Sequence, residues 1–249
     1  MSAKITLDKD TKQKLDDYRT SATLTGEQIV FKTFPKKLQD FVDSTSNPQS
    51  PFHLSNASHS TDATVYPTPS TTEPDSKKRK LDSGAVKNGV AACSSNDIQH
   101  AKHPGMMLSN KHMIAVHETL KRECEILVDL CDKVKLWINL SMPNGDNFGV
   151  QIQEDCLSEL HRSQETALNL RDAARQDYLT RAKICTKVMK YPFVEDYALS
   201  LKEHDERQLF MARQQLHDLR SVYAVLTDIL HKNIDKIRSP KGNNSGTMY

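Results

Sequence analysis

Glycine is scarce in this sequence of 249 residues, which contains 8. Phosphate-cradling loops, tight hairpins and doubly wound sheets need glycine, so the sequence offers little material for any of them. Aromatic residues make up only 6%, and neither charge dominates, because 34 basic residues face 32 acidic ones. This near-balance lacks the footprint of a nucleic-acid-binding protein, so no direct contact with nucleic acid is expected. The composition is typical of long helices rich in Leu, Lys, Glu, Asp and Gln.

Long apolar runs are also missing. No stretch of about 18 apolar residues is present, so neither a membrane-spanning helix nor a membrane partner is expected. Residues 1–10 carry Asp8 and Asp10 and contain no apolar segment, so no secretory signal is predicted. The five cysteines are scattered and never arranged as CxxC. We therefore expect reduced thiols in an intracellular protein.

Four stretches repeat apolar residues every three or four positions, which is the period of a helix buried on one face. The first is expected within residues 1–43, with a kink or break at Pro35, because proline lacks the N–H that an inner helical turn requires. The second covers residues 104–141. Its apolar face follows spacings of 3-4-4-3-4-3-4 and consists of Met113, Val116, Leu120, Cys124, Leu127, Cys131, Val134 and Ile138.

The third and fourth helices are expected over residues 150–190 and 191–237. Tyr191 and Pro192 separate them, because the residue before a proline is driven out of the helical conformation. The face of the third helix is predicted to consist of Leu160, Ala167, Leu170, Ala174, Tyr178, Ala182, Cys185 and Met189. Residues 238–249 are predicted to form a short polar tail.

Residues 44–103 are expected to form a disordered insert. Seventeen of these sixty residues are Ser or Thr and five are Pro, while large apolar residues are isolated. Such a segment cannot bury enough apolar surface to offset the entropy of ordering it.

These patterns predict an all-α protein built as an elongated four-helix bundle, with no competing strand pattern. Short connections make the second, third and fourth helices antiparallel neighbours. Leu130 and Trp137 lie beyond the main apolar stripe of the second helix, which suggests lateral self-association.

Catalytic and metal-binding signatures are absent. No GxGxxG, Walker A, GxSxG or HExxH motif occurs, and none of the ten histidines follows a glutamate by three positions. Cys124 and Cys131 are better explained as small core residues than as a redox pair. We therefore predict a protein that is not an enzyme, with no catalytic residue, metal or cofactor; an enzyme with a cofactor in the bundle core is nearly excluded.

Two short motifs each allow two interpretations. The basic run Lys77, Lys78, Arg79 and Lys80 is either a nuclear localisation signal read by an import receptor or a solvated charge run. The turn 142–149 is either a plain connection with Phe148 tucked onto the bundle end or a rigid contact loop.

Several motifs in the same order carry a family resemblance. They are Met142-Pro143 with Gly145–Glu154, Thr180–Lys183, Lys190–Pro192, Val194–Tyr197, Phe34–Leu38 and Lys232–Ile237 before a tail ending in Tyr249. In this combination the sequence resembles the eleven-S (REG) proteasome activators. The basic run within the insert is similar to the nuclear import signal of the gamma subtype.

The resemblance implies a specific activity. Members of this family form heptameric rings of four-helix protomers that cap the α-subunit ring of the 20S proteasome without ATP and open its gate. The gamma subtype forms a homoheptamer that stimulates degradation of peptides and some unstructured proteins without ubiquitin. The gamma subtype is nuclear, so the nucleus is the expected location, with the cytoplasm as a second one.

The resemblance also assigns roles to residues. The activation loop would consist of Pro143, Asn144, Gly145, Asp146, Asn147, Phe148, Gly149 and Val150. The docking tail would consist of Ser245, Gly246, Thr247, Met248 and Tyr249, whose terminal carboxylate would pair with a lysine of the proteasome. Lys183 would be a channel-side residue that tunes which peptidase activity is stimulated.

One departure from the family pattern concerns the loop. The family loop usually carries two asparagines before its Phe-Gly pair, after an acidic stretch, whereas here the loop is shorter and the first asparagine is Asp146. The alternative function considered is a nuclear helical-bundle adaptor without a role at the proteasome.

Overall fold

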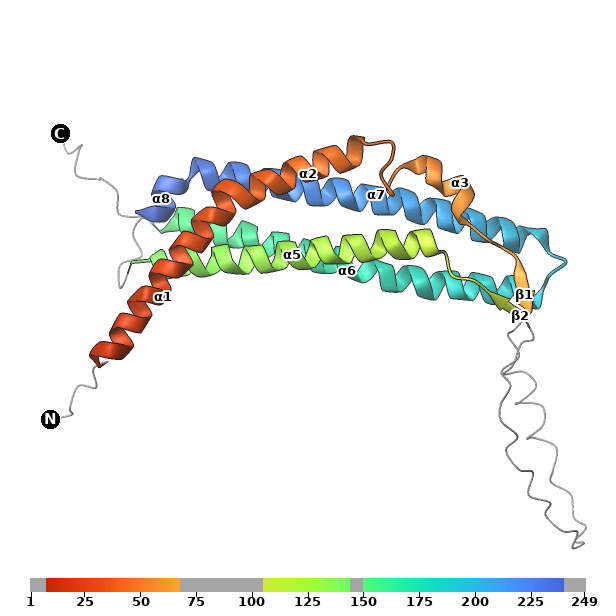
Figure 1. The fold of residues 1–249 in the computed structure, drawn as a ribbon, viewed down its shortest axis with the longest axis horizontal. Helices are drawn as coiled ribbons and strands as arrows, with labels where there is room; N and C mark the ends of the chain where they lie inside the picture. Colours follow the sequence, from red (N-terminus) through yellow and green to blue (C-terminus); the bar gives the residue numbers. More distant parts are fainter. Residues whose placement is uncertain (1–7, 68–104, 144–149, 240–249) are drawn as a thin grey trace, which may run out of the picture.

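The computed structural model describes residues 8–67, 105–143 and 150–239. Four helices lie side by side along one long axis (Figure 1). They are α2 (Phe34–Ser46), α5 (Lys111–Ser141), α6 (Gln151–Lys190) and α7 (Glu195–Lys232). With 40 residues, α6 is about 60 Å long. The prediction of an elongated all-α bundle is confirmed, and α5, α6 and α7 pack on one another in chain order.

The N-terminal helix is interrupted as predicted. α1 (Lys9–Gln28) passes into the π-helical turn η1 (Ile29–Thr33), and α2 then begins at Phe34. Pro35 lies in the first turn of α2, where the missing N–H breaks no helical hydrogen bond. α1 crosses one end of the bundle at an angle, whereas α2 lies along α7 (Figure 1).

The predicted disordered insert is wrong for its first part, because residues 44–67 are folded. α2 continues to Ser46, and η2 (Leu54–Asn56) and α3 (Ala57–Ser60) follow. Phe52 is buried in the core, and the His112 ring nitrogen Nε2 lies 2.9 Å from the Pro51 carbonyl oxygen. A few anchoring residues thus hold a segment whose composition is otherwise that of a loop. The basic run at 77–80 lies outside the described residues.

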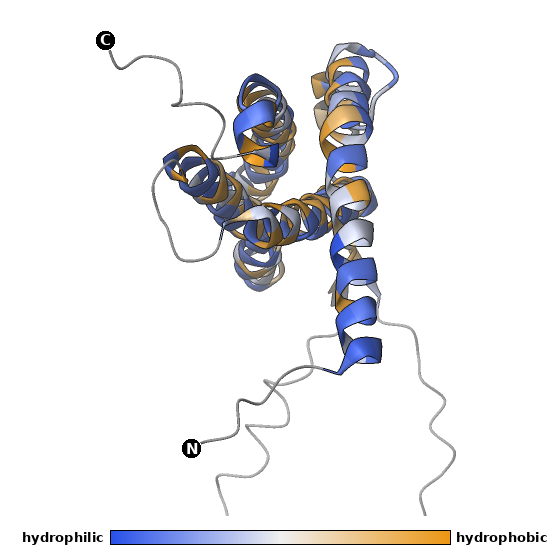
Figure 2. Cartoon of the chain, turned by 90° about the vertical axis from the view of Figure 1, so that its left-hand side faces the viewer, coloured by the Kyte–Doolittle hydropathy of each residue, from blue (hydrophilic) through white to orange (hydrophobic). Residues whose placement is uncertain are grey.

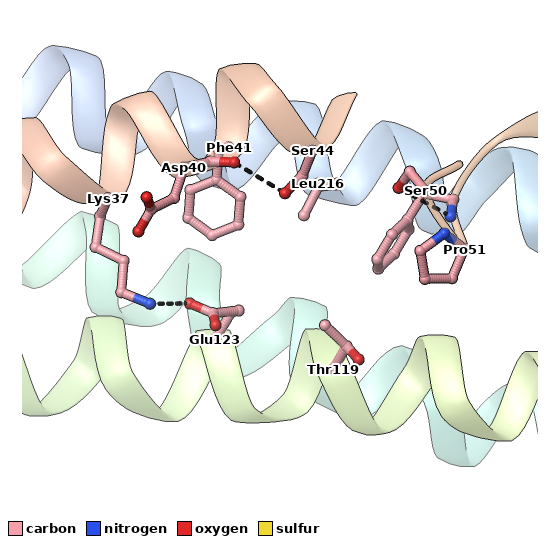
Figure 3. Close-up of a pocket in the computed structure, with 10 residues that line it drawn as sticks. Lys37, Asp40, Phe41, Ser44, Ser50, Pro51, Thr119, Glu123 and Leu216 are labelled. Atoms are coloured by element: carbon pink, nitrogen blue, oxygen red, sulfur yellow. Dashed lines mark hydrogen bonds and ion pairs between the residues drawn. The ribbon is translucent and has the colours of Figure 1, made fainter. Parts of the chain in front are cut away.

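The Pro51–Phe52 turn encloses a small cavity of about 190 Å³ against α2, α5 and α7 (Figure 3). At its edge the Lys37 ammonium lies 2.6 Å from the Glu123 carboxylate, and both side chains are largely buried. This ion pair connects α2 to α5 across the cavity.

The expectation that no strand forms is also wrong. β1 (Val65–Pro67) pairs antiparallel with β2 (Gly105–Met107) at the end of the bundle opposite α8 (Figure 1). As a result the second predicted helix begins at Lys111, not at Pro104. Asn110 caps it by accepting a hydrogen bond from the Met113 N–H at 3.0 Å.

The predicted apolar face of α5 is confirmed, because all eight of its residues are buried. Leu130 and Trp137 are buried within the same chain, so they are wrong as candidates for lateral self-association. Trp137 packs on Gly26 of α1, where a Cβ atom would approach its side chain to 2.7 Å. The wide apolar stripe of α5 is therefore explained by the crossing of α1.

The predicted face of α6 is interrupted in its second half. Leu160, Ala167, Ala174 and Cys185 are buried, but Tyr178 and Ala182 are exposed. Beside these two positions the helix buries Asp177 and Arg181, which the predicted face does not include.

Asp177 joins three helices through two histidines. The Nε2 atoms of His117 on α5 and His204 on α7 each lie 2.8 Å from an oxygen of the Asp177 carboxylate. Because a carboxylate only accepts, both imidazoles donate. Burial alone would raise the pKa of Asp177, but these two hydrogen bonds outweigh it and hold the pKa below its ordinary value.

We expect Asp177→Asn to lower the free energy of unfolding by about 3 kcal/mol at pH 7 and by less at pH 3. The folded-state pKa lies below the unfolded one, so the stabilising contribution is complete above about pH 4 and is lost as the pH falls through the folded-state pKa. Urea unfolding at both pH values measures it. Asp172→Asn is the matched control, since Asp172 is exposed on the same helix. An equal penalty at both pH values would contradict this account of the cluster.

The fourth predicted helix is divided near its end. α7 stops at Lys232, and α8 (Ile234–Arg238) continues after Asn233, whose side chain donates to the Ile229 carbonyl at 2.8 Å. A side-chain donor that competes for a helical carbonyl explains the break at this residue.

Candidate functional site

The predicted contact loop and the predicted tail leave the bundle at the same end (Figure 1). α5 ends at Ser141, and the structure describes Pro143, the first residue of the predicted loop, and Val150, its last residue. α8 packs against both α5 and α6 at this end. Ser239, which follows α8, is the last residue that the structure describes. We call this region the loop–tail end.

One buried side chain connects the base of the loop to the base of the tail. Gln153, in the first turn of α6, donates from Nε2 to the Ile237 carbonyl of α8 at 2.9 Å. Gln153 and Ile237 are fully buried, and Val150 is nearly so. Gln153 Oε1 has no hydrogen-bond partner among the described residues, so a buried polar atom is left unsatisfied here. The positions where the loop ends and the tail begins are thus fixed relative to each other.

The N-terminal helix holds α8 from the other side. Arg238 donates from Nε to the Glu27 carboxylate at 2.8 Å, and its guanidinium lies 5.4 Å from the centre of the Phe31 ring. The His231 ring nitrogen Nε2 lies 2.9 Å from the Val30 carbonyl oxygen. These contacts give the start of the tail a rigid support built from α1, η1 and α7.

Few of the predicted site residues lie within the described part of the chain. Pro143 and Val150 are at the loop–tail end. Lys183 lies elsewhere: it is exposed on α6, 33 residues beyond Val150 and therefore about 50 Å along the helix. The loop residues 144–149 and the tail residues 245–249 lie outside the described residues.

Sequence reasoning gave no role to the residues that fix the loop–tail end, namely Gln153, Ile237, Arg238 and Glu27. The available signal was that Gln153 and Ile237 fall within the motifs Gly145–Glu154 and Lys232–Ile237, which carry the family resemblance. Neither a single buried glutamine nor the ion pair between Glu27 and Arg238, which lie 211 positions apart, produces a periodic pattern in the sequence.

The buried thiols do not form a reactive site. Cys124, Cys131, Cys156 and Cys185 are free and buried. Burial raises the pKa of Cys124 and Cys131 to about 12 and that of Cys156 to about 11, so they stay protonated near neutral pH.

Within residues 8–67, 105–143 and 150–239, no three His, Cys, Asp or Glu side chains are grouped to hold a metal ion. No helix in the same ranges is both long and apolar enough to cross a membrane.

Comparison with known proteins identifies the family. Residues 106–247 match the family described as "Proteasome activator PA28, C-terminal". The chain is 32% identical over 262 aligned positions to the human protein named Proteasome activator complex subunit 3, with 100% of both chains covered. The chain belongs to the PA28 proteasome activator family. The predicted resemblance to the eleven-S (REG) activators is thereby confirmed.

Solved structures agree with this assignment to the PA28 family. The crystal structure of the 11S subunit of the Plasmodium falciparum proteasome, PA28, matches with a TM-score of 0.68 and 28% identity, covering 97% of this chain and 100% of that one. A second crystal structure, that of an archaeal 20S proteasome in complex with mutated P26 activator, matches with a TM-score of 0.60 at 12% identity. At this low identity the match supports the fold alone. These relatives are named as activators rather than as enzymes.

Proposed function

We propose that this protein is a non-catalytic activator that caps the 20S proteasome as a homoheptameric ring and opens its gate without ATP. The observation that carries the proposal is that the loop and the tail leave one end of a rigid bundle, joined by Gln153 and Ile237. In a ring of parallel protomers, every copy presents both segments to the same partner surface. The predicted adaptor function explains neither this convergence nor membership in the PA28 family.

The tail is proposed to supply attachment. A carboxylate on Tyr249 binds strongly only when it is buried opposite a cation, and ordering one tail costs entropy. Seven tails on one rigid ring act at high effective concentration, so weak single contacts add up to firm binding. The tight fixation of α8 shortens the path over which each tail is free.

The loop is proposed to supply gate opening. A group that displaces the α-subunit N-termini has to be held stiffly, and the loop is anchored by the ends of two long packed helices. Opening then follows from preferential binding to the open α ring. The negative charge of Asp146 and the shortened loop are proposed to affect gate opening. Docking is proposed to depend on the tail, separately from the loop.

Removal of residues 245–249 is expected to weaken binding to purified 20S proteasome by about a hundredfold or more and to abolish peptidase stimulation. Changing Asn147 or Gly149 to Ala is expected to spare binding and abolish stimulation. Co-sedimentation measures binding, and hydrolysis of fluorogenic peptides without ATP measures stimulation. If the truncated chain binds and stimulates like the full chain, the tail is not the anchor.

Gln153→Leu is expected to weaken the apparent affinity for 20S proteasome by about tenfold, because the base of every tail loses its fixed position. The same variant leaves the Ile237 carbonyl without its donor, which lowers the free energy of unfolding by about 1 kcal/mol. Gln151→Leu is the matched control: Gln151 is exposed two residues earlier on α6. Equal affinities of the two variants would show that the buried link does not serve docking.

Two further roles are part of the proposal. Lys77, Lys78, Arg79 and Lys80 are proposed to bind an import receptor and place the protein in the nucleus. Lys183 is proposed to tune which peptidase activity is stimulated, and its exposure on α6 leaves it free to face a channel. Lys78→Ala/Arg79→Ala in a fluorescent fusion tests the first role, and substrate-resolved peptidase assays of Lys183→Glu test the second.

A further inference from the structure

The first part of α1, residues 9–22, projects from the bundle (Figures 1 and 2). We call it the α1 arm. Most of its side chains are exposed. In the part of the chain that the structure describes, the polar side chains of residues 9–20 pair only within α1 or with its N-cap Asp8, for example Lys14 with Asp10 at 2.6 Å. A helix of this length without tertiary contacts is marginal in water, so a partner surface would stabilise it.

The arm carries an apolar stripe that continues the buried face of α1. Leu15, Tyr18 and Ala22 follow at spacings of three and four, and the same spacing leads on to Gly26 and Ile29, which are buried against the bundle. Leu15 is 42% and Tyr18 is 55% exposed. The apolar face of α1 therefore packs against the bundle near the C-terminal end of the helix, whereas along the arm it has no partner among the described residues.

Cations flank this stripe. Lys12 and Arg19 lie three and four positions from Leu15, and Lys14 lies four positions before Tyr18, so each is a neighbour of the stripe on the helix surface. Lys14 and Arg19 pair with Asp10 and Asp16 of the arm, so Lys12 is the flanking cation that has no ion-pair partner among the described residues. A fitting partner surface is an apolar groove with a carboxylate at its rim that has no cation of its own.

One groove of the same protein has this chemistry. It lies between α5 and α6, has a volume of about 390 Å³, and includes Val128, Ala167 and Leu168. Leu168 is 54% exposed. The charged residues that line the groove are Glu125, Asp129, Asp132 and Arg171. Glu125 pairs with Arg171 at 2.9 Å and Asp129 with Lys133 at 2.6 Å, so Asp132 is the carboxylate of the groove that has no ion-pair partner among the described residues.

The arm of the same copy does not lie along this groove. α1 is a continuous helix through Gln28, and its buried end packs on Trp137, in the last part of α5. From that crossing the arm points away from the bundle (Figure 2). The occupant consistent with this geometry is the arm of another copy.

We propose that the α1 arm docks into the α5–α6 groove of a second copy of this chain, with Leu15 and Tyr18 against Leu168. Because the arm and the groove are different surfaces, the contact is head-to-tail. Repetition of such a contact forms a ring where the rotation between copies closes and a helical filament where it does not. The proposal rests on the self-assembly part of the proposed function and specifies one of its contacts.

Cross-linking between copies tests the contact directly. With Cys93→Ser as background, chains carrying Tyr18→Cys are mixed with chains carrying Leu168→Cys, and a short thiol cross-linker is added. The four remaining native cysteines are buried and protonated. We expect dimeric products from this mixture and none when Leu168→Cys is replaced by Phe210→Cys, which is equally exposed but lies on α7.

The affinity test uses Leu15→Ser/Tyr18→Ser. We expect its self-association to be about a hundredfold weaker by sedimentation analysis, with an unchanged urea midpoint for the bundle. The control Leu199→Ser removes an equally exposed leucine from α7 and is expected to assemble like the wild type. One result overturns the arm contact and leaves the ring: the wild type assembles, the Tyr18→Cys/Leu168→Cys pair does not cross-link, and Leu15→Ser/Tyr18→Ser assembles like the wild type. A wild type that stays monomeric overturns both.

Discussion

Asp205→Ala is expected to lower the free energy of unfolding by about 3–5 kcal/mol, one of the largest losses from any single side chain here. The Asp205 side chain is 1% exposed, and Arg181 donates to it from Nε at 3.0 Å. Asn110 and Thr61 each donate to its second oxygen, also at 3.0 Å. Removing the carboxylate leaves a buried guanidinium without its counter-charge. It also deprives the half-buried Thr61 hydroxyl of this acceptor and leaves the Asn110 amide only its 3.4 Å contact with Ser60 Oγ.

This loss is distinguishable from a general effect of removing charge from α7. Urea unfolding followed by the fluorescence of the single tryptophan, Trp137, measures the free energy. Glu206→Ala is the control, because Glu206 is the adjacent residue and forms only a loose pair with Lys202 at 3.9 Å. We expect the control to change stability by less than about 0.5 kcal/mol. Equal losses in the two variants would show that the Arg181–Asp205 pair does not stabilise this part of the bundle.

Trp137→Ala is expected to cost about 3–5 kcal/mol, because a fully buried indole leaves a cavity that the surrounding helices cannot fill. The same change is expected to reduce the cost of Gly26→Ala without removing it. In the wild type an added Cβ at Gly26 meets Cβ and Cε3 of Trp137 at 2.7 Å and its Cδ2 at 2.8 Å, so overpacking costs about 1–3 kcal/mol. Trp137→Ala removes the indole atoms but keeps Cβ, and the helix propensity of alanine, about 1 kcal/mol better than that of glycine, then offsets part of the cost that remains.

A double-mutant cycle measured by circular dichroism in urea tests this coupling. Leu136→Ala, at the partly exposed position before Trp137, is the control and is expected to cost about 1 kcal/mol and to leave the Gly26→Ala penalty unchanged. If Gly26→Ala costs the same with and without Trp137, the contact is not what holds α1 across the loop–tail end.

The apolar period predicted helix positions well where burial and hydrophobicity coincide. All eight predicted residues of α5 are buried, and α6 begins within one residue of its predicted start. The prediction fails at Tyr178 and Ala182 of α6, because the helix there buries Asp177 and Arg181 against partners on α5 and α7. A buried charge is stabilised by partners distant in sequence, so hydrophobic periodicity alone does not reveal it.

The functional end was predictable in outline from motif resemblance rather than from physics. The resemblance placed Pro143 and Val150 in the loop, and the helical pattern brought the start of the tail to the same end. Neither indicated Gln153, whose buried amide joins the two segments. The folded part of 44–67 was missed for a related reason, since one buried side chain, Phe52, anchors a stretch whose composition is that of a loop.

The central claim is that one end of this bundle docks onto the 20S proteasome and opens it. The most direct measurement is fluorogenic peptide hydrolysis by purified 20S proteasome without ATP, with native mass measured on the same mixture. The account predicts a complex of 20S particles with a ring of this chain and faster hydrolysis than by 20S alone. A chain that stays monomeric, forms no complex and leaves the hydrolysis rate unchanged would contradict it.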